Sequence, residues 1–162
     1  MVQTIQVREA DDADREVLIG FHQSLYQGHR DEVVNKDDLP LIEYRDYDRV
    51  LREDLQALLR DPNSHVLIAD SEGTAVGYIT GRVIVEPRRV LPRRGVVEDW
   101  YVAPKARGAG VGARLLRELE ERFAAVGCEV IESATWSSNE GARRAHDALG
   151  FREIRVVYRK RV

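Results

Sequence analysis

The chain has 162 residues, of which 43% are hydrophobic and 33% are charged, and its formal net charge is −3 at pH 7. This composition excludes a disordered acidic tail, and no run of residues reaches the roughly 18–20 apolar residues that a membrane-spanning helix needs. The small negative charge argues against a general nucleic-acid binder. We therefore expect one domain over residues 1–162, with no nucleic acid and no membrane as partner.

Two further features concern the compartment and metals. Residues 1–16 indicate a strand followed by an acidic helix start, without the basic and apolar regions of a signal peptide. Cys128 is the only cysteine, which excludes an internal disulfide and a zinc site built from several cysteines. We expect a cytoplasmic protein without a bound metal.

The first third of the chain predicts two helices joined by a charged connection. Alternating apolar and polar residues predict a strand over residues 4–8, and aspartates at 11, 12 and 14 suit the cap and first turn of a helix. Residues 31–48 have no clear period and hold seven acids against two bases, a net charge of −5, so we expect a long surface connection. A second helix has Leu51 and Leu55 on one face and ends before Asp61 and Pro62.

The rest of the chain predicts strands that alternate with helices. Apolar or alternating runs predict strands over residues 65–69, 75–85, 96–102, 128–135 and 151–158. One helix is expected over about residues 110–126 with Gly127 at its end, and another begins at the capping-box pair Ser137 and Glu140 and ends at Gly150. A hairpin in the middle and crossovers at the end imply a mixed sheet covered by helices, an α/β or α+β fold.

The most informative segment is a glycine-rich turn between a predicted strand and the strongest helix. From Arg107 to Ala113 it reads Arg-Gly-Ala-Gly-Val-Gly-Ala. Small residues let main-chain N–H groups converge, and the first N–H groups of a helix have no partner inside the helix. Together with the helix dipole they predict an anion site suited to a phosphate or pyrophosphate, and Arg107 can add a charge-assisted contact.

Three other interpretations of this turn are considered. A P-loop is rejected because no Lys-Ser or Lys-Thr follows the glycines. The dinucleotide-binding fingerprint fits Gly108-x-Gly110-x-x-Ala113, with an acidic residue about 20 positions later, so an oxidoreductase stays open as an alternative. Against it, five residues separate the strand from the glycines, and the strand contains Glu98-Asp99, which is unusual for a doubly buried parallel strand. A tight turn in which glycines serve packing alone also stays open.

A longer stretch resembles a known family. Glu98-Asp-Trp-Tyr-Val102, followed by Pro104 and Arg107-x-x-Gly110-x-Gly112, is similar to the acetyl-CoA-binding core of the GNAT family of N-acetyltransferases. A second family segment runs from Asn139 to Phe151, at the expected distance. The resemblance covers residues 96–151 and implies an N-acetyltransferase with a twisted mixed sheet of about six to seven strands, covered by four helices and splayed at the central strand.

The resemblance implies acetyl-CoA as co-substrate. The main chain from Trp100 to Val102 would pair with the pantetheine arm as an added strand would, and the N–H groups from Gly108 to Ala113 would hold the pyrophosphate. The side chain of Asn139 would hydrogen-bond the pantetheine arm. The implied binding residues are Trp100, Tyr101, Val102, Arg107, Gly108, Ala109, Gly110, Val111, Gly112, Ala113 and Asn139.

Acetyl transfer to an amine needs a proton acceptor, because a primary alkylamine with a pKa of about 10.4 is mostly protonated at pH 7. Glu98 and Asp99 lie on the strand that should meet the thioester, and adjacent strand residues point to opposite faces, so we expect one of them in the cleft. Their spacing resembles the Glu-Asp-x-Tyr-Val pattern of polyamine acetyltransferases in the family, in which the glutamate is the usual base. This resemblance favours Glu98, while a structural pairing of both carboxylates with arginines stays open.

His146 stands where the family usually has a tyrosine that protonates the departing thiolate. It shares one helical face with Ala142, Ala145 and Leu149, which places its ring on the inward side. A protonated histidine can donate to the sulfur, so His146 is a candidate acid. A packing histidine is the alternative.

The sequence says least about the amine that would accept the acetyl group. The acidic connection 31–48 would attract a cationic amine, either a small molecule or a peptide amine, although a solvated loop without such a role is equally open. Because the usual tyrosine is replaced, a catalytically silent GNAT-like acyl-CoA-binding sensor remains an alternative to the transferase. Family habit also makes a homodimer an expectation that no residue demonstrates.

Overall fold

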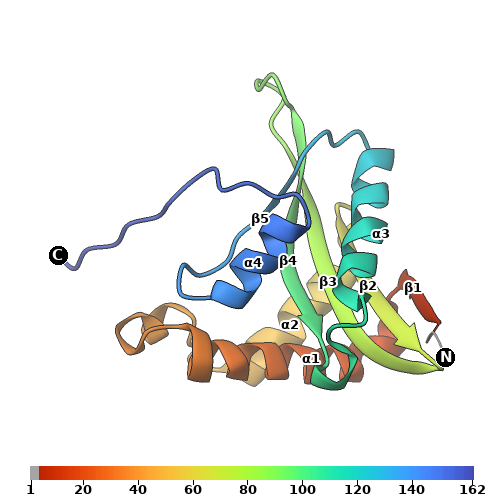
Figure 1. Ribbon diagram of the computed structural model, residues 1–162, viewed down its shortest axis with the longest axis horizontal. Coiled ribbons are helices and arrows are strands. Elements are labelled where there is room, and N and C mark those ends of the chain that lie inside the picture. Colours follow the sequence, from red (N-terminus) through yellow and green to blue (C-terminus); the bar gives the residue numbers. More distant parts are fainter. Residues whose placement is uncertain (1–3) are drawn as a thin grey trace.

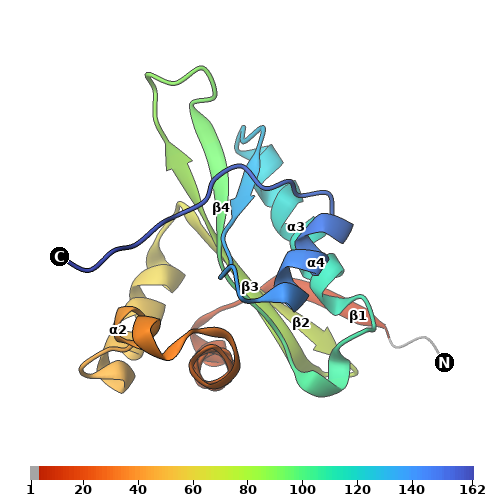
Figure 2. The same cartoon turned by 60° about the vertical axis from the view of Figure 1, so that its left-hand side comes forward.

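A computed structural model describes residues 4–162 of the chain as a mixed sheet with helices on both faces (Figures 1 and 2). The five strands lie in the order β1 (Ile5–Glu9), β2 (Ser64–Ser71), β3 (Thr74–Val85), β4 (Arg93–Val102) and β5 (Ile131–Ser133). Neighbours from β1 to β4 pair antiparallel, and β5 pairs parallel to β4. The predicted α/β fold with a mixed sheet is confirmed.

Four α-helices cover this sheet, as predicted. They are α1 (Arg15–Gly28), α2 (Tyr47–Arg60), α3 (Val111–Ala125) and α4 (Glu140–Ala148). Short 3-10 turns lie at Asp12–Asp14, Lys36–Leu41 and Pro104–Ala106, and a π turn at His29–Val33 extends α1 into the acidic connection. None of the helices described is long and apolar enough to cross a bilayer.

The helices divide between the two faces of the sheet, and each side has its own core (Figure 2). On one face α3 packs against β2, β3 and β4 through Leu115, Leu119 and Phe123, which are fully or almost fully buried. On the other face α1 and α2 bury Leu18 and Leu55 around the ring of Tyr78. The sheet, with β4 in it, therefore separates a core under α3 from a core under α1 and α2.

The packing of α3 depends on the absence of side chains at two strand positions. The Phe123 ring lies against Gly81 of β3 and Gly95 of β4, and a Cβ built on Gly95 would fall 2.2 Å from the ring. Phe123 is itself buried, so it has little room to move aside. These glycines set how closely α3 approaches the sheet.

Three sequence predictions are wrong in detail. The sheet has five strands rather than six or seven, because residues 151–158 pair with no strand in the part of the chain described and β5 is shorter than the predicted 128–135. Alternation gives a segment the side-chain pattern of a strand, but a strand forms only where a partner edge is in reach. The cap of α4 is Asn139, whose side chain accepts the Ala142 N–H, rather than Ser137.

The close contact at Phe123 gives a stability prediction. Gly95→Ala should lower the free energy of unfolding by about 1–3 kcal/mol, since the added methyl overpacks a filled site. Chemical denaturation measures the change. The control is Gly20→Ala in α1, where a Cβ meets nothing within 4 Å and the better helix former should stabilise by about 0.5–1 kcal/mol. Equal stability of the Gly95 variant and the wild type would contradict this packing.

Candidate active site

The site is built around the point where β4 and β5 part. The two strands pair only from Gly95 to Val97 on β4, opposite Ile131 to Ser133 on β5. The Asp99 N–H donates to the Thr80 hydroxyl on β3, and the Ala103 N–H donates to the Val76 carbonyl on the same side. Because main-chain groups alternate along a strand, those of Trp100 and Val102 face the open side. The predicted splay is therefore present.

A β-bulge brings both strand carboxylates to one face of the sheet. Ile79 pairs with Trp100 and Gly81 pairs with Val97, so Thr80 alone faces Glu98 and Asp99. The Thr80 hydroxyl accepts the Asp99 N–H at 3.0 Å. The expectation that the two carboxylates point to opposite faces of the sheet is wrong, because simple alternation does not hold across a bulge.

Glu98 faces Arg82 of β3, which also reaches Asp61 at the end of α2. Its carboxylate is 3.5 Å from Arg82, which also lies 3.8 Å from Asp61, and the Glu98 side chain is 35% exposed. Partial burial raises the pKa of the Glu98 carboxyl, and the nearby Asp99 and Asp61 charges add to this rise while Arg82 opposes it. A carboxylate with a raised pKa is a better proton acceptor than an ordinary glutamate.

Asp99 faces a polar cluster on α1 and α2 that the sequence analysis did not identify. Its carboxylate is 3.8 Å from His22, whose Nδ1 is 2.7 Å from the Tyr47 hydroxyl. Burial lowers the pKa of His29, while the Asp99 charge opposes this shift. Tyr26 stacks on Tyr47 with ring centroids 4.2 Å apart. His22, Tyr26 and His29 are spaced i, i+4 and i+7 and so form a polar stripe along one face of α1 and its extension. This spacing is the sequence signal from which the cluster could have been predicted.

On the opposite face, the glycine-rich turn presents free main-chain donors. Gly108 and Gly110 have φ near +77° and +79°, in the left-handed region that favours glycine. No side chain caps α3, and none of the N–H groups of residues 108–113 donates to an acceptor within residues 4–162. Arg107 folds back, with its Nε donating to the Val102 carbonyl and its guanidinium over the Tyr101 ring. The N–H groups on which the predicted anion site depends are therefore without a partner in residues 4–162.

A cavity of about 360 Å³ connects this turn with α4 and the open side of β4. Trp100, Val102, His146 and Leu149 form its walls beyond the turn. Most predicted binding residues line it, namely Trp100, Val102, Arg107, Gly108, Gly110, Val111, Gly112 and Ala113. Tyr101 points to the other face and packs in the core of α1 and α2, while Ala109 and Asn139 lie outside the lining.

Both ring nitrogens of His146 have partners. Nδ1 lies 2.6 Å from the Ala142 carbonyl, which can only accept, so Nδ1 carries the proton. Nε2 lies 2.7 Å from the Ser133 hydroxyl, which donates to it when the ring is neutral. The ring also packs edge-on against Trp100 and Phe151. His146 is therefore fixed at the end of β5, where the strands part.

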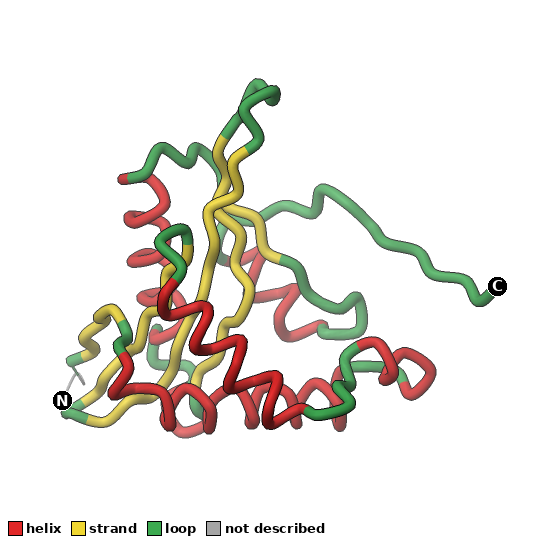
Figure 3. Tube along the Cα trace, turned by 180° about the vertical axis from the view of Figure 1, so that it is seen from behind, coloured by secondary structure: helices red, strands yellow, loops and turns green. Residues whose placement is uncertain are grey.

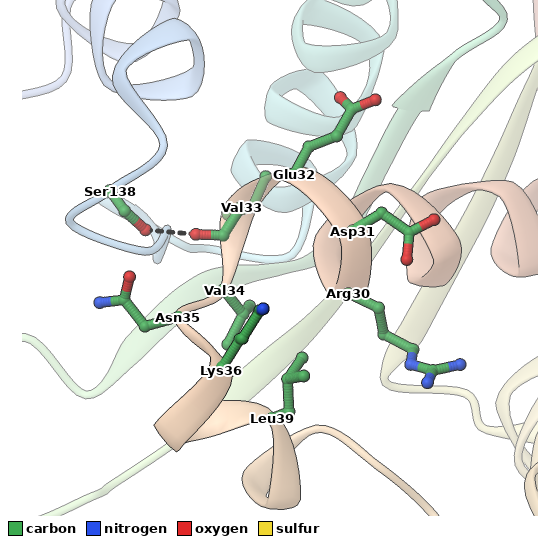
Figure 4. A pocket seen from close by; sticks show the side chains of 9 residues that line it. All are labelled: Arg30, Asp31, Glu32, Val33, Val34, Asn35, Lys36, Leu39 and Ser138. Atoms are coloured by element: carbon green, nitrogen blue, oxygen red, sulfur yellow. Dashed lines mark hydrogen bonds between the residues drawn. The ribbon is translucent and has the colours of Figure 1, made fainter.

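A second, more polar hollow of about 570 Å³ lies between the acidic connection and the loop before α4 (Figure 4). The Ser138 hydroxyl donates to the Val33 carbonyl across it. Asp31, Glu32 and Lys36 contribute charged groups to its rim. Residues 30–39 and Ser138, from the loop that follows β5, therefore line the same hollow.

No group of three or more His, Cys, Asp or Glu side chains within residues 4–162 is arranged to hold a metal ion. The lone thiol of Cys128 is partly buried, and burial raises its pKa. The side chains of the site that can exchange protons are the carboxylates Glu98 and Asp99 and the imidazole of His146.

Comparison with known proteins agrees with this geometry. Residues 23–151 match the Acetyltransferase (GNAT) family. An aminoglycoside N(6')-acetyltransferase type 1 from Stenotrophomonas maltophilia is 33% identical over 117 residues, which covers 70% of this chain and 76% of that protein. The N-alpha-acetyltransferase RimI from Mycobacterium tuberculosis is 37% identical over 96 residues, covering 59% of this chain and 57% of that protein.

Solved structures share the fold. The aminoglycoside N-acetyltransferase AAC(6')-Iy in complex with CoA superposes with a TM-score of 0.77 at 23% identity, covering 99% of this chain and 97% of the other. The same enzyme with a bisubstrate analogue of CoA and acetylneamine gives a TM-score of 0.75 at 24% identity, covering 98% and 99%.

Proposed function

Because the chain belongs to the GNAT acetyltransferase family and is an N-acetyltransferase, we propose that it transfers the acetyl group of acetyl-CoA directly to a primary amine in a ternary complex. The observation that carries the proposal is the row of unpaired N–H groups at residues 108–113, from which a cavity leads to the parted strands. The CoA complexes of structural neighbours agree with this assignment.

Acetyl-CoA would lie along the open side of β4. The N–H groups at the start of α3 would hold its pyrophosphate, with Arg107 turning outward to add a charge-assisted contact. The Trp100 carbonyl and the Val102 N–H, which face the open side of β4, would pair with the amides of pantetheine, as in strand addition. The Asn139 carboxamide oxygen already caps α4, so only its NH2 group is free for the same arm.

The reaction would occur where Glu98 and His146 flank the gap. The amine nitrogen attacks the thioester carbon, and Glu98 takes the amine proton directly or through a water. The Trp100 N–H donates to the carbonyl oxygen as negative charge develops there. The C–N bond forms, the C–S bond breaks, and the thiolate leaves. His146 in its protonated form would donate from Nε2 to the sulfur, exchanging its Ser133 contact for this one.

We infer that the acceptor is a cationic small-molecule amine, with a peptide amine as the alternative. Asp99 and Glu98 supply negative charge, and the tyrosines at positions 26, 44 and 47 form an aromatic cluster that His22 links to Asp99. Aromatic faces and carboxylates together attract ammonium groups. The aminoglycoside acetyltransferases among the relatives favour the small molecule, and the N-alpha-acetyltransferase among them keeps the peptide open.

The proposal predicts acceptor-dependent release of free CoA thiol. Acetyl-CoA is incubated with the protein and with aminoglycosides, polyamines or peptides bearing a free amine, and the thiol is measured colorimetrically. We expect release with at least one polycationic amine and none with its fully N-acetylated form. No release with any amine, despite tight CoA binding, would favour a silent acyl-CoA-binding module instead.

Glu98 gives a mutational prediction. Glu98→Gln should lower kcat by about a hundredfold or more, because the proton acceptor is lost. In the wild type, kcat/KM should fall on acidification at a higher pH than an ordinary glutamate would give, since the pKa of Glu98 is raised, and this limb should vanish in the variant. Steady-state kinetics across pH measures both effects.

Stability distinguishes this loss from misfolding. A carboxyl whose pKa is raised on folding binds its proton more readily in the folded state, so its contribution to stability falls as pH rises through the unfolded and then the folded pKa. The neutral Gln should therefore leave the melting temperature at pH 7 unchanged or higher. Glu120→Gln on the exposed side of α3 is the control and should change neither property. Wild-type kcat in the Glu98 variant would remove it as the base.

His146 gives a second prediction. His146→Phe should lower turnover at neutral pH about tenfold or more with little change in acetyl-CoA affinity, because the aromatic packing is kept while the proton donor is lost. Turnover and calorimetric binding measure the two quantities separately. Asp147→Asn, exposed on the same helix, is the control. Unchanged turnover would assign His146 a packing role alone.

A further inference from the structure

The proposed reaction must remove two protons from one nitrogen. An alkylamine with a pKa of about 10.4 reaches the site as an ammonium group with three N–H protons, and the amide product keeps one of them. Glu98 accounts for the proton that is lost as the C–N bond forms. The other proton must leave before the attack, because an ammonium nitrogen has no free electron pair. The site therefore needs a second proton acceptor near Glu98.

Asp99 lies next to Glu98, but the two carboxylates have different partners. Glu98 is 3.5 Å from Arg82, and an arginine does not give up its proton in proteins. Within residues 4–162, the basic side chain that lies within 4 Å of the Asp99 carboxylate is that of His22, whose Nε2 is 3.8 Å away. A histidine both takes up and releases a proton near neutral pH. Asp99 is thus the carboxylate whose partner can carry a proton onward.

The other ring nitrogen of His22 faces a hydroxyl group. Nδ1 is 2.7 Å from the hydroxyl of Tyr47, which lies on α2, on the same face of the sheet as α1 (Figure 3). Tyr47 is half-buried, and burial raises its pKa, so the hydroxyl gives a proton to water only as it receives one. The 3.8 Å step from Asp99 to His22 is longer than a hydrogen bond, and such contacts commonly shorten when substrate binds. Asp99, His22 and Tyr47 therefore form a chain from the parted strands towards solvent.

The nearest histidine and tyrosine stay neutral while this chain carries a proton. Burial lowers the pKa of His29, so a second imidazolium does not form beside His22. The Tyr78 hydroxyl is buried and has no hydrogen-bond partner within residues 4–162, and burial together with the Asp99 charge raises its pKa. It keeps its proton and can offer it to the Asp99 carboxylate. The other titratable groups near the chain are Tyr26, Tyr44, Asp48 and Tyr101.

We propose that Asp99 takes the first proton of the bound ammonium group and that His22 carries it to Tyr47 and water. The N–H bond breaks, its electron pair stays on the nitrogen, and the proton passes from the Asp99 carboxylate to Nε2 of His22. The protonated ring then releases its Nδ1 proton to the Tyr47 oxygen as the Tyr47 hydroxyl proton moves to water. The neutral amine attacks the thioester, and Glu98 takes the second proton. Asp99 touches the acceptor and is catalytic, whereas His22 and Tyr47 act through it and are positioning residues.

The inference rests on the proposed function, and the pH dependence of turnover tests it separately. Raising the pH from 7 to about 9.5 increases the neutral fraction of an alkylamine several hundredfold, so the first proton no longer has to be removed in the site. His22→Gln keeps a polar side chain but cannot carry a proton. Its kcat should be at least tenfold below wild type at pH 7 and approach wild type at about pH 9.5. Turnover is measured as CoA thiol release with kanamycin, spermidine or a peptide with a free amino terminus, whichever reacts fastest.

His65→Gln is the matched control. The His65 ring is 3.7 Å from the Glu9 carboxylate, and its side chain is 19% exposed against 23% for His22, but it packs on Phe123 on the opposite face of the sheet. Its turnover should equal that of the wild type at both pH values. Tyr47→Phe keeps the stacked ring and should show a smaller loss than His22→Gln with the same pH dependence. Circular dichroism should show all three variants folded at both pH values.

The outcomes distinguish the inference from the proposed function. An equal loss at both pH values in His22→Gln, or a rise in the acceptor KM without a fall in kcat, would overturn the inference alone, because a structural role or simple attraction of the ammonium group gives those results. Since His22 acts through Asp99, adding His22→Gln to Asp99→Asn should cost no further turnover at pH 7, and a further tenfold loss would also count against it. A wild type that acetylates none of the three amines would overturn the proposed function and the inference with it.

Discussion

The β-bulge at Glu98 and Asp99 is the local constraint on which the rest of the site depends. Two residues of β4 face one residue of β3, so one N–H would be left unpaired inside the sheet. The buried hydroxyl of Thr80 accepts it. The bulge directly follows the last pair between β4 and β5, Val97 with Ser133, so both carboxylates emerge where the sheet opens. A regular strand would have sent one of them into the core of α3.

Beyond the bulge, β4 separates two chemical environments. Trp100 and Val102 face the cavity under α3 and α4, whose walls offer apolar surface and main-chain donors. Asp99 and Tyr101 face α1 and α2, where histidines and tyrosines gather around the carboxylates. In the proposed reaction, a thioester held on one side and an amine held on the other would meet through the gap beside β5. The sheet would thus position the two reactants, and such positioning can supply much of the rate enhancement of a direct transfer.

The sequence predicted the glycine-rich turn, four helices and four of the five strands closely, because each depends on local patterns. Asp11 caps the first turn, Asp61 follows the end of α2, and Gly127 adopts a left-handed conformation just beyond α3. The bulge was not predictable from β4 alone, since it depends on Thr80 in the neighbouring strand. The cluster of His22 and Tyr47 around Asp99 joins three segments distant in sequence. The strand predicted over residues 151–158 does not form, because a strand needs a partner edge as well as an alternating pattern, and that edge cannot be predicted from the segment itself.

His146 connects the cavity to Phe151, the residue that follows the turn at the end of α4. Its ring lies between Trp100 of β4 and Phe151, and its nitrogens bond α4 and the end of β5. Four segments therefore meet at one side chain. A tyrosine at position 146 would have one hydroxyl for such contacts, whereas a histidine offers two nitrogens on opposite sides of a small ring. The histidine can thus fasten α4 to β5 through Ser133 while its ring packs against Phe151, so the end of α4 is held beside the point where the strands part.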